Sequence, residues 1–222
     1  MTVERQHILQ RRVRFIVYFT IVYNVGEAII SLAAGAAADS GALVAFGLDS
    51  VIEVSSAVVV AWQYSRAQPE RWERAAARLV ACCFFALFVC VSADSIHALW
   101  AGRAAEHSPI GIAITLLSLI VMPVVAWWEY QAGKELQSPS VMGDAKQLMV
   151  CLSLSVVVLV GLVLNAWCGW WWADPAAALV VAVLGLKEGI EVWREGEICC
   201  APTPATRTGA TCQGECSSHG ES

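Results

Sequence analysis

Six apolar stretches, most of them long enough to cross a lipid bilayer, constrain this chain more than any other feature. A membrane-spanning helix needs about 20 mostly apolar residues. Because helices and closed barrels alone satisfy their backbone polar groups within lipid, the pattern predicts an all-α integral membrane protein with six transmembrane helices. The stretches are found at about 13–36, 41–62, 75–100, 110–130, 143–167 and 174–186.

The composition excludes several other classes of protein. The chain is 58% hydrophobic and 15% charged, with a mean hydropathy of +0.61, which fits neither a soluble globule nor a disordered protein. It has no basic footprint for nucleic acid. Adjacent Cys82 and Cys83 lack the C-x-x-C spacing of a thiol oxidoreductase. We therefore expect no enzymatic activity and no prosthetic group.

The basic residues predict the orientation of the chain. If both termini are cytoplasmic, Arg103 is the one exception among fourteen lysines and arginines to the rule that cytoplasmic segments are positive. We therefore expect a multi-pass protein of the cell membrane with both ends in the cytoplasm. The expected divisions are a basic amino terminus at 1–12, a six-helix transmembrane domain at 13–195 and a disordered cysteine-rich tail at 196–222.

Two carboxylates interrupt the apolar stretch at 41–62. Asp49 and Glu53 are four residues apart, so they share one face of a helix. A charge at the centre of a bilayer costs on the order of 3 kcal/mol, and intramembrane acids are functional by default. The pair therefore predicts a binding site for a cation.

The stretch at 143–167 offers matching side chains. Gln147 and Cys151 are again four residues apart, and antiparallel pairing brings Cys151 toward Asp49 and Gln147 toward Glu53 near the middle of the bilayer. Two carboxylates, a thiolate and an amide oxygen favour zinc or cadmium over magnesium or calcium. For Gln147, a hydrogen bond between helices is an equal alternative to ligation.

Other polar residues in the spans are candidates for accessory roles. Glu27 is either a proton carrier or accessory ligand, or a packing acid bonded to Asn24, and Asn24 is itself a candidate for an accessory or proton-coupling role. Asp94 and His97, three residues apart near the outer end of their span, form either an exit-side metal site or a solvated pair. Asp174 and Pro175 are typical of the N-cap and first turn of the last span.

The polar segment after the last span is rich in thiols. Small and polar residues surround them, so without metal this tail is expected to be disordered. Its spacing matches no recognised zinc finger, but a tail that captures metal explains thiols that serve no core. The candidate ligands are Cys199, Cys200, Cys212, Cys216 and His219.

The runs SGALVAFGLDSVIEV (40–54), GDAKQLMVC (143–151) and WADPAAALVV (172–181) together resemble the second, fifth and sixth helices of the cation diffusion facilitator transporters. Asp49 matches the first of the family's two aspartates in its second helix, and Glu53 replaces the second. Gln147 stands at the histidine of the family's fifth helix and Cys151 at its aspartate. Asp144 matches a family aspartate that is usually not a core ligand, so it is a candidate for an accessory or proton-coupling role.

The resemblance implies a metal exporter that exchanges a cytoplasmic divalent ion, zinc first and cadmium next, for protons, usually as a homodimer in lipid. The family's usual cytoplasmic domain after the sixth helix is expected to be missing, because only 196–222 follow. The alternative is a non-transporting membrane metal-binding protein or sensor that uses its cysteine-rich tail. The ligands leave the metal and the direction of transport open.

Overall fold

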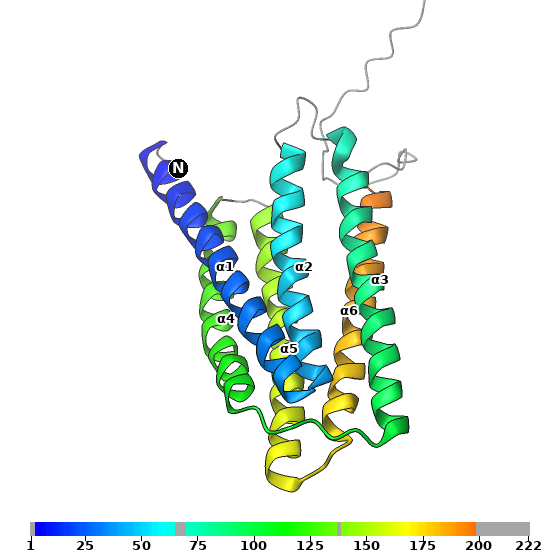
Figure 1. Cartoon of the computed structure of the whole chain (residues 1–222). Coiled ribbons are helices and arrows are strands. Elements are labelled where there is room, and N and C mark those ends of the chain that lie inside the picture. Colours follow the sequence, from blue (N-terminus) through cyan, green and yellow to red (C-terminus); the bar gives the residue numbers. More distant parts are fainter. Residues whose placement is uncertain (1–2, 65–69, 137–138, 199–222) are drawn as a thin grey trace, which may run out of the picture.

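In the computed structural model, the chain folds into six long helices (Figure 1). The structure describes residues 3–64, 70–136 and 139–198, and at some helix ends it describes the backbone alone. No strand occurs within these three ranges, which confirms the predicted all-α class. The helices are α1 (Val3–Ala38), α2 (Gly41–Tyr64), α3 (Glu70–Ala101), α4 (Pro109–Leu136), α5 (Pro139–Cys168) and α6 (Ala173–Ile198).

Five of the six helices, α1 to α5, contain segments that are long and apolar enough to span a membrane. The α6 helix is not among them, because Asp174 stands at its start and Lys187, Glu188 and Glu191 interrupt its second half. It nevertheless runs beside α3 within the bundle (Figure 1). Successive helices run in opposite directions, as the sequence pattern predicts, while the cytoplasmic placement of the termini stays a prediction.

The helices extend beyond the predicted spans. The α1 helix begins at Val3, well inside the expected basic amino terminus, and α6 continues to Ile198. The α4 helix runs on through Pro123 without a break in its assignment. The thiols of the tail lie outside the described residues, so metal capture by the tail remains a prediction.

Three helix pairs make the most extensive contacts: α1 with α2, α3 with α6, and α4 with α5. The main apolar core lies where α2, α3, α5 and α6 meet, with Phe46, Val158 and Val181 among its fully buried side chains. The α2 helix contacts α1, α3, α5 and α6. Its polar side chains are therefore held from several directions.

Glycines allow α1 and α2 to approach closely. A Cβ atom at Gly47 would lie 2.9 Å from Leu32 Cγ on α1, and one at Gly35 would lie 2.8 Å from the Val44 backbone nitrogen on α2. Small residues at helix contacts are typical of membrane proteins, where packing rather than water drives association. The α1–α2 contact therefore depends on glycine at both positions.

Gly161 plays the same role between α5 and α6, and we expect Gly161→Ala to destabilise the fold. The added Cβ would lie 2.5 Å from Ala177 Cβ, closer than carbon atoms can approach. Overpacking of this kind costs about 1–3 kcal/mol. Thermal unfolding in detergent measures the change. Gly26→Ala is the matched control, since nothing lies within 4 Å of a Cβ there, and equal melting temperatures for the two variants would contradict the prediction.

The turn between α1 and α2 is fixed by polar contacts. Asp39 has a positive φ of 50° and ends α1, while the Ser40 backbone N–H donates to Gly35 O at 2.9 Å. This is the bond of a Schellman cap, in which the residue after the helix adopts the left-handed conformation. Ser40 then caps α2, because its Oγ accepts a hydrogen bond from the Leu43 backbone N–H at 3.2 Å.

Asp174 joins this turn to α6. Its carboxylate accepts hydrogen bonds from Ser40 Oγ at 2.5 Å and from the Ala42 backbone N–H at 3.3 Å. The sequence predicted Asp174 as the N-cap of its own helix, but it lies inside the first turn of α6 and caps α2 instead. A carboxylate near the amino ends of two helices is favoured by both dipoles.

Candidate metal-binding site

Three of the predicted ligands come together between α2 and α5. One carboxylate oxygen of Asp49, one of Glu53 and the Sγ atom of Cys151 all lie within 4.8 Å of one another. Asp49 and Cys151 are buried, with exposed fractions of 4% and 2%, and Glu53 is half-buried. The structure thus brings together the i, i+4 pair of α2 and the thiol of α5.

The three ligand atoms are somewhat more widely spaced than those of a closed metal site. Bonds of about 2.0–2.3 Å to oxygen and sulfur hold the ligands of a tetrahedral zinc ion roughly 3.3–3.8 Å apart. The observed limit of 4.8 Å is therefore about 1–1.5 Å wider than a closed site.

The other two predicted residues of α5 stay untested. Gln147 lies one helical turn before Cys151, and Asp144 one turn earlier, but the structure describes only the backbone there. Their spacing of three and four residues places both near the α5 face that carries Cys151. Ligation by Gln147 therefore remains a prediction.

The α1 helix adds a buried polar layer beside these ligands. Asn24 Nδ2 donates to Glu53 Oε2 at 2.6 Å, and Ser50 Oγ on α2 donates to Glu27 Oε2 at 2.9 Å. Asn24 and Glu27 are 3% and 1% exposed. The packing alternative for Glu27 predicted a bond to Asn24, but each of the two binds α2 instead.

In this layer, Asn24 Oδ1 is shielded from solvent and has no hydrogen-bond partner among the described residues. Tyr23 and Glu27, also on α1, interact with each other and with Ser118 on α4. Buried polar groups are nearly always paired, so each such atom calls for an explanation. A site that receives a ligand is one such explanation.

Negative charge accumulates around Asp49. Glu27 on α1 and Glu188 on α6 both act on it electrostatically, although neither is part of the three-ligand cluster. Within the part of the chain whose side chains are described, Asp49 forms no ion pair. Acids buried without a basic partner attract a cation from solution. The sequence did not single out Glu188.

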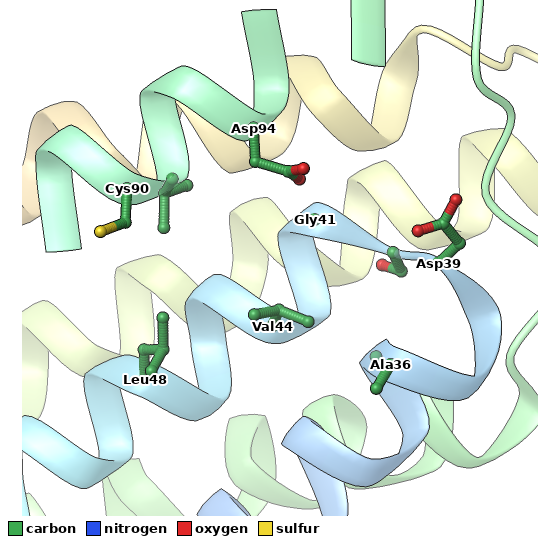
Figure 2. A pocket seen from close by; sticks show the side chains of 10 residues that line it. Ala36, Asp39, Gly41, Val44, Leu48, Cys90 and Asp94 are labelled. Atoms are coloured by element: carbon green, nitrogen blue, oxygen red, sulfur yellow. The ribbon is translucent and has the colours of Figure 1, made fainter. Parts of the chain in front are cut away.

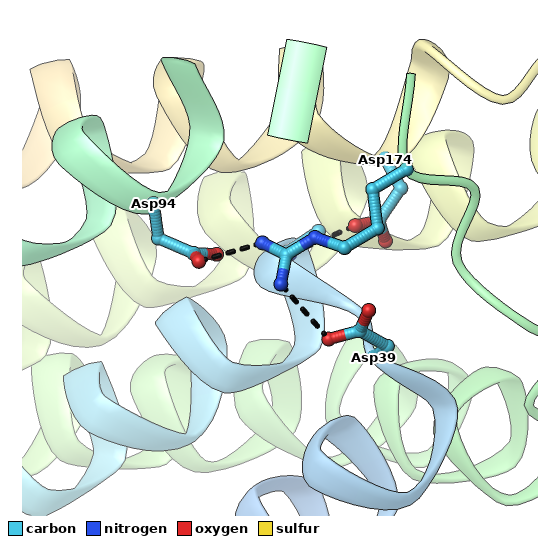
Figure 3. A network of polar contacts seen from close by, with 5 residues as sticks. Asp39, Asp94 and Asp174 are labelled. Carbon is cyan, nitrogen blue, oxygen red and sulfur yellow. Dashed lines mark hydrogen bonds and ion pairs between the residues drawn. The ribbon is translucent and has the colours of Figure 1, made fainter. Parts of the chain in front are cut away.

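The outer candidates, Asp94 and His97, lie near the carboxyl end of α3 and are not part of the cluster on α2 and α5. Arg103 Nη2 contacts Asp94 Oδ1 at 2.7 Å, and Arg103 Nη1 contacts Asp39 Oδ1 at 3.4 Å (Figure 3). The bond to Asp94 raises the pKa of the Arg103 guanidinium, which is charged at any physiological pH. His97 is exposed. The sequence did not predict this ion pair. The position of Arg103, as the one basic residue on the predicted outer side, could have indicated it.

A pocket of about 320 Å³ lies beside Asp94 (Figure 2). It is lined by the α1–α2 turn, by Val44 and Leu48 of α2 and by Cys90 of α3. Asp49 and Glu53 do not line it, so it is separate from the three-ligand cluster. No described group of three ligand-type side chains gathers there.

The fold agrees with a comparison to known families. The cation efflux transmembrane domain matches residues 17–196, which includes nearly all of the six helices. The chain belongs to this family. The match confirms two predictions: the resemblance to the cation diffusion facilitators, and the placement of this chain in a membrane as a multi-pass protein.

Relatives of this cation efflux domain protein include named metal transporters. A transporter of Synechocystis is 28% identical over 78% of this chain and 61% of its own length. A cadmium, cobalt and zinc/H(+)-K(+) antiporter of Bacillus subtilis is 29% identical over 38% of this chain and 27% of its own length. Transmembrane protein 163 of Xenopus laevis is 24% identical over 66% of this chain and 54% of its own length. The chain thus spans about three-fifths or less of these relatives.

Proposed function

We propose that this protein exports a divalent transition metal, zinc first and cadmium next, from the cytoplasm in exchange for protons. The observation that carries the proposal is the convergence of Asp49, Glu53 and Cys151 between two membrane helices. Membership of the cation efflux family and the antiporter among its relatives support it. The metal is the cargo of the protein and not a resident cofactor.

Proton exchange follows from the chemistry of these ligands. Carboxylates and a thiol bind a metal only after they lose their protons, so loading the ion releases protons and reprotonation expels it. Metal and protons therefore compete for one set of atoms. A site open alternately to the two sides of the membrane converts this competition into antiport.

The donor set argues for the class of metal. A thiolate favours zinc, cadmium and other soft or borderline ions, whereas magnesium and calcium prefer oxygen ligands alone. Gln147 is proposed as a weak neutral ligand from α5. We further propose that the protein acts as a homodimer in the lipid bilayer and that the tail thiols gather metal at the cytoplasmic mouth.

Transport by the purified full chain in proteoliposomes tests this function. The vesicles carry a zinc indicator and a pH dye inside, and a proton gradient is imposed in either direction. We expect zinc and cadmium to move against an opposite proton flux, while magnesium does not move. Vesicles without protein are the control. A chain that binds zinc but moves no ion under either gradient is not a transporter, and a non-transporting metal-binding protein would take its place.

A further inference from the structure

Asn24 on α1 reaches the cluster of Asp49, Glu53 and Cys151 with one end of its amide. Its Nδ2 atom donates to Glu53 Oε2 at 2.6 Å, and its side chain is 3% exposed. The other end, Oδ1, is shielded from solvent and has no hydrogen-bond partner among the described residues. An amide oxygen without a donor in an apolar interior is unfavourable, so it points to a group that binds it at another stage.

The cluster also needs a further ligand. The three ligand atoms of the described cluster come from α2 and α5, whereas zinc in proteins takes four or, less often, five. Gln147, proposed above as a weak ligand, is an alternative or additional source of oxygen. Within one amide group the oxygen and nitrogen lie about 2.3 Å apart, so a half turn about χ2 brings Oδ1 to the place that Nδ2 holds beside Glu53. The oxygen then lies beside the carboxylate of Glu53, which is one of the three ligands.

Charge favours an amide in this position over another acid. Two carboxylates and a thiolate carry three negative charges when ionised, and one divalent ion leaves a charge of about −1 in the membrane. A fourth anion would increase that excess, while Glu27 and Glu188 already act on Asp49. A neutral oxygen completes the coordination without adding charge.

We propose that Asn24 Oδ1 is a metal ligand, so that α1, α2 and α5 together hold the ion. The inference rests on the proposed metal site and adds a residue to it. When protons replace the metal, the amide turns back and Nδ2 donates to Glu53, as in this structure. Asn24 thus serves the site in both states, first as an oxygen ligand and then as a hydrogen-bond donor.

Two substitutions separate ligation from mere positioning of Glu53. Asn24→Ala removes both ends of the amide, whereas Asn24→Asp keeps an oxygen and loses the donor. If Asn24 ligates, we expect zinc affinity measured by calorimetry to fall at least about tenfold in the alanine variant and to recover in part in the aspartate variant at raised pH, because the oxygen is kept but a negative charge is added. If Asn24 only positions Glu53, the aspartate variant binds no better than the alanine variant, which overturns the proposal.

A cobalt spectrum gives a second measurement that does not depend on affinity. Asn24→Cys is expected to strengthen the sulfur-to-cobalt charge-transfer band, because a second thiolate then joins Cys151 on the ion. Ser31→Cys is the matched control: it adds one thiol to a buried position on the same helix, two turns from Asn24. Equal bands in the two variants would overturn the proposal.

The same measurements keep the two proposals apart. If Asp49→Asn binds zinc as tightly as the wild type does, the proposed site itself is wrong. If Asp49→Asn removes binding while Asn24→Ala leaves it intact, the site stands and the role of Asn24 is wrong. Gln147→Ala, measured alongside, shows whether α5 supplies a second ligand.

Discussion

Asp49→Asn is expected to reduce zinc transport in proteoliposomes by about 100-fold or more. The substitution keeps the size of the side chain and removes the charge of a ligand that is 4% exposed. Removing even the hydrogen-bond partner of a metal ligand commonly costs 10–100-fold in affinity, and losing a charged ligand costs more. Initial rates of zinc uptake at several zinc concentrations measure the loss.

Glu191→Gln is the matched control for this loss of charge. Glu191 lies on α6, is exposed, and contacts Lys187 one turn earlier at 3.5 Å. Exposed pairs of this kind contribute about 0–1 kcal/mol, so transport should be close to wild type. Normal zinc transport by Asp49→Asn would show that the ion passes elsewhere in the protein.

Cys151→Ser is expected to change which metal the protein prefers. The thiolate is the one soft ligand of the cluster. Serine replaces it with a hydroxyl oxygen, which is a hard and weak ligand. Cadmium affinity should fall by about 100-fold and zinc affinity by only about tenfold. Competition between the two metals for the purified chain measures the ratio directly.

Cys168→Ser controls for the removal of a thiol from the same helix. Cys168 ends α5 and is exposed, far along the helix from Cys151. Its removal should leave the ratio of cadmium to zinc affinity unchanged. A ratio that stays constant in Cys151→Ser as well would mean that the buried thiol does not touch the ion.

Much of this arrangement could be predicted because helical periodicity is local. The spacing of Asp49 and Glu53 fixes a shared face whatever the surroundings, and antiparallel neighbours set the depth at which Cys151 meets them. The apolar stretches likewise predicted six helices. Charges at both ends of α6 make its apolar part short, and contact with α3 supports it instead.

Contacts between distant segments could not be predicted in this way. Asp174 caps α2 and not its own helix, because the first turn of α6 lies beside Ser40. Arg103 meets Asp94 and Asp39 through a loop whose path no periodic pattern determines. The bond between Asn24 and Glu53 similarly depends on how far α1 is rotated against α2.

The close approach of α1 and α2 at Gly35 and Gly47 bears on how the site moves. Because the backbones are close at two positions along the contact, we expect the two helices to move together as one unit. Asn24, Asp49 and Glu53 all belong to that unit. The thiol of Cys151 belongs to α5, which packs chiefly on α4. A change of shape that opens the site therefore alters one set of distances above all, those between the sulfur and the oxygens.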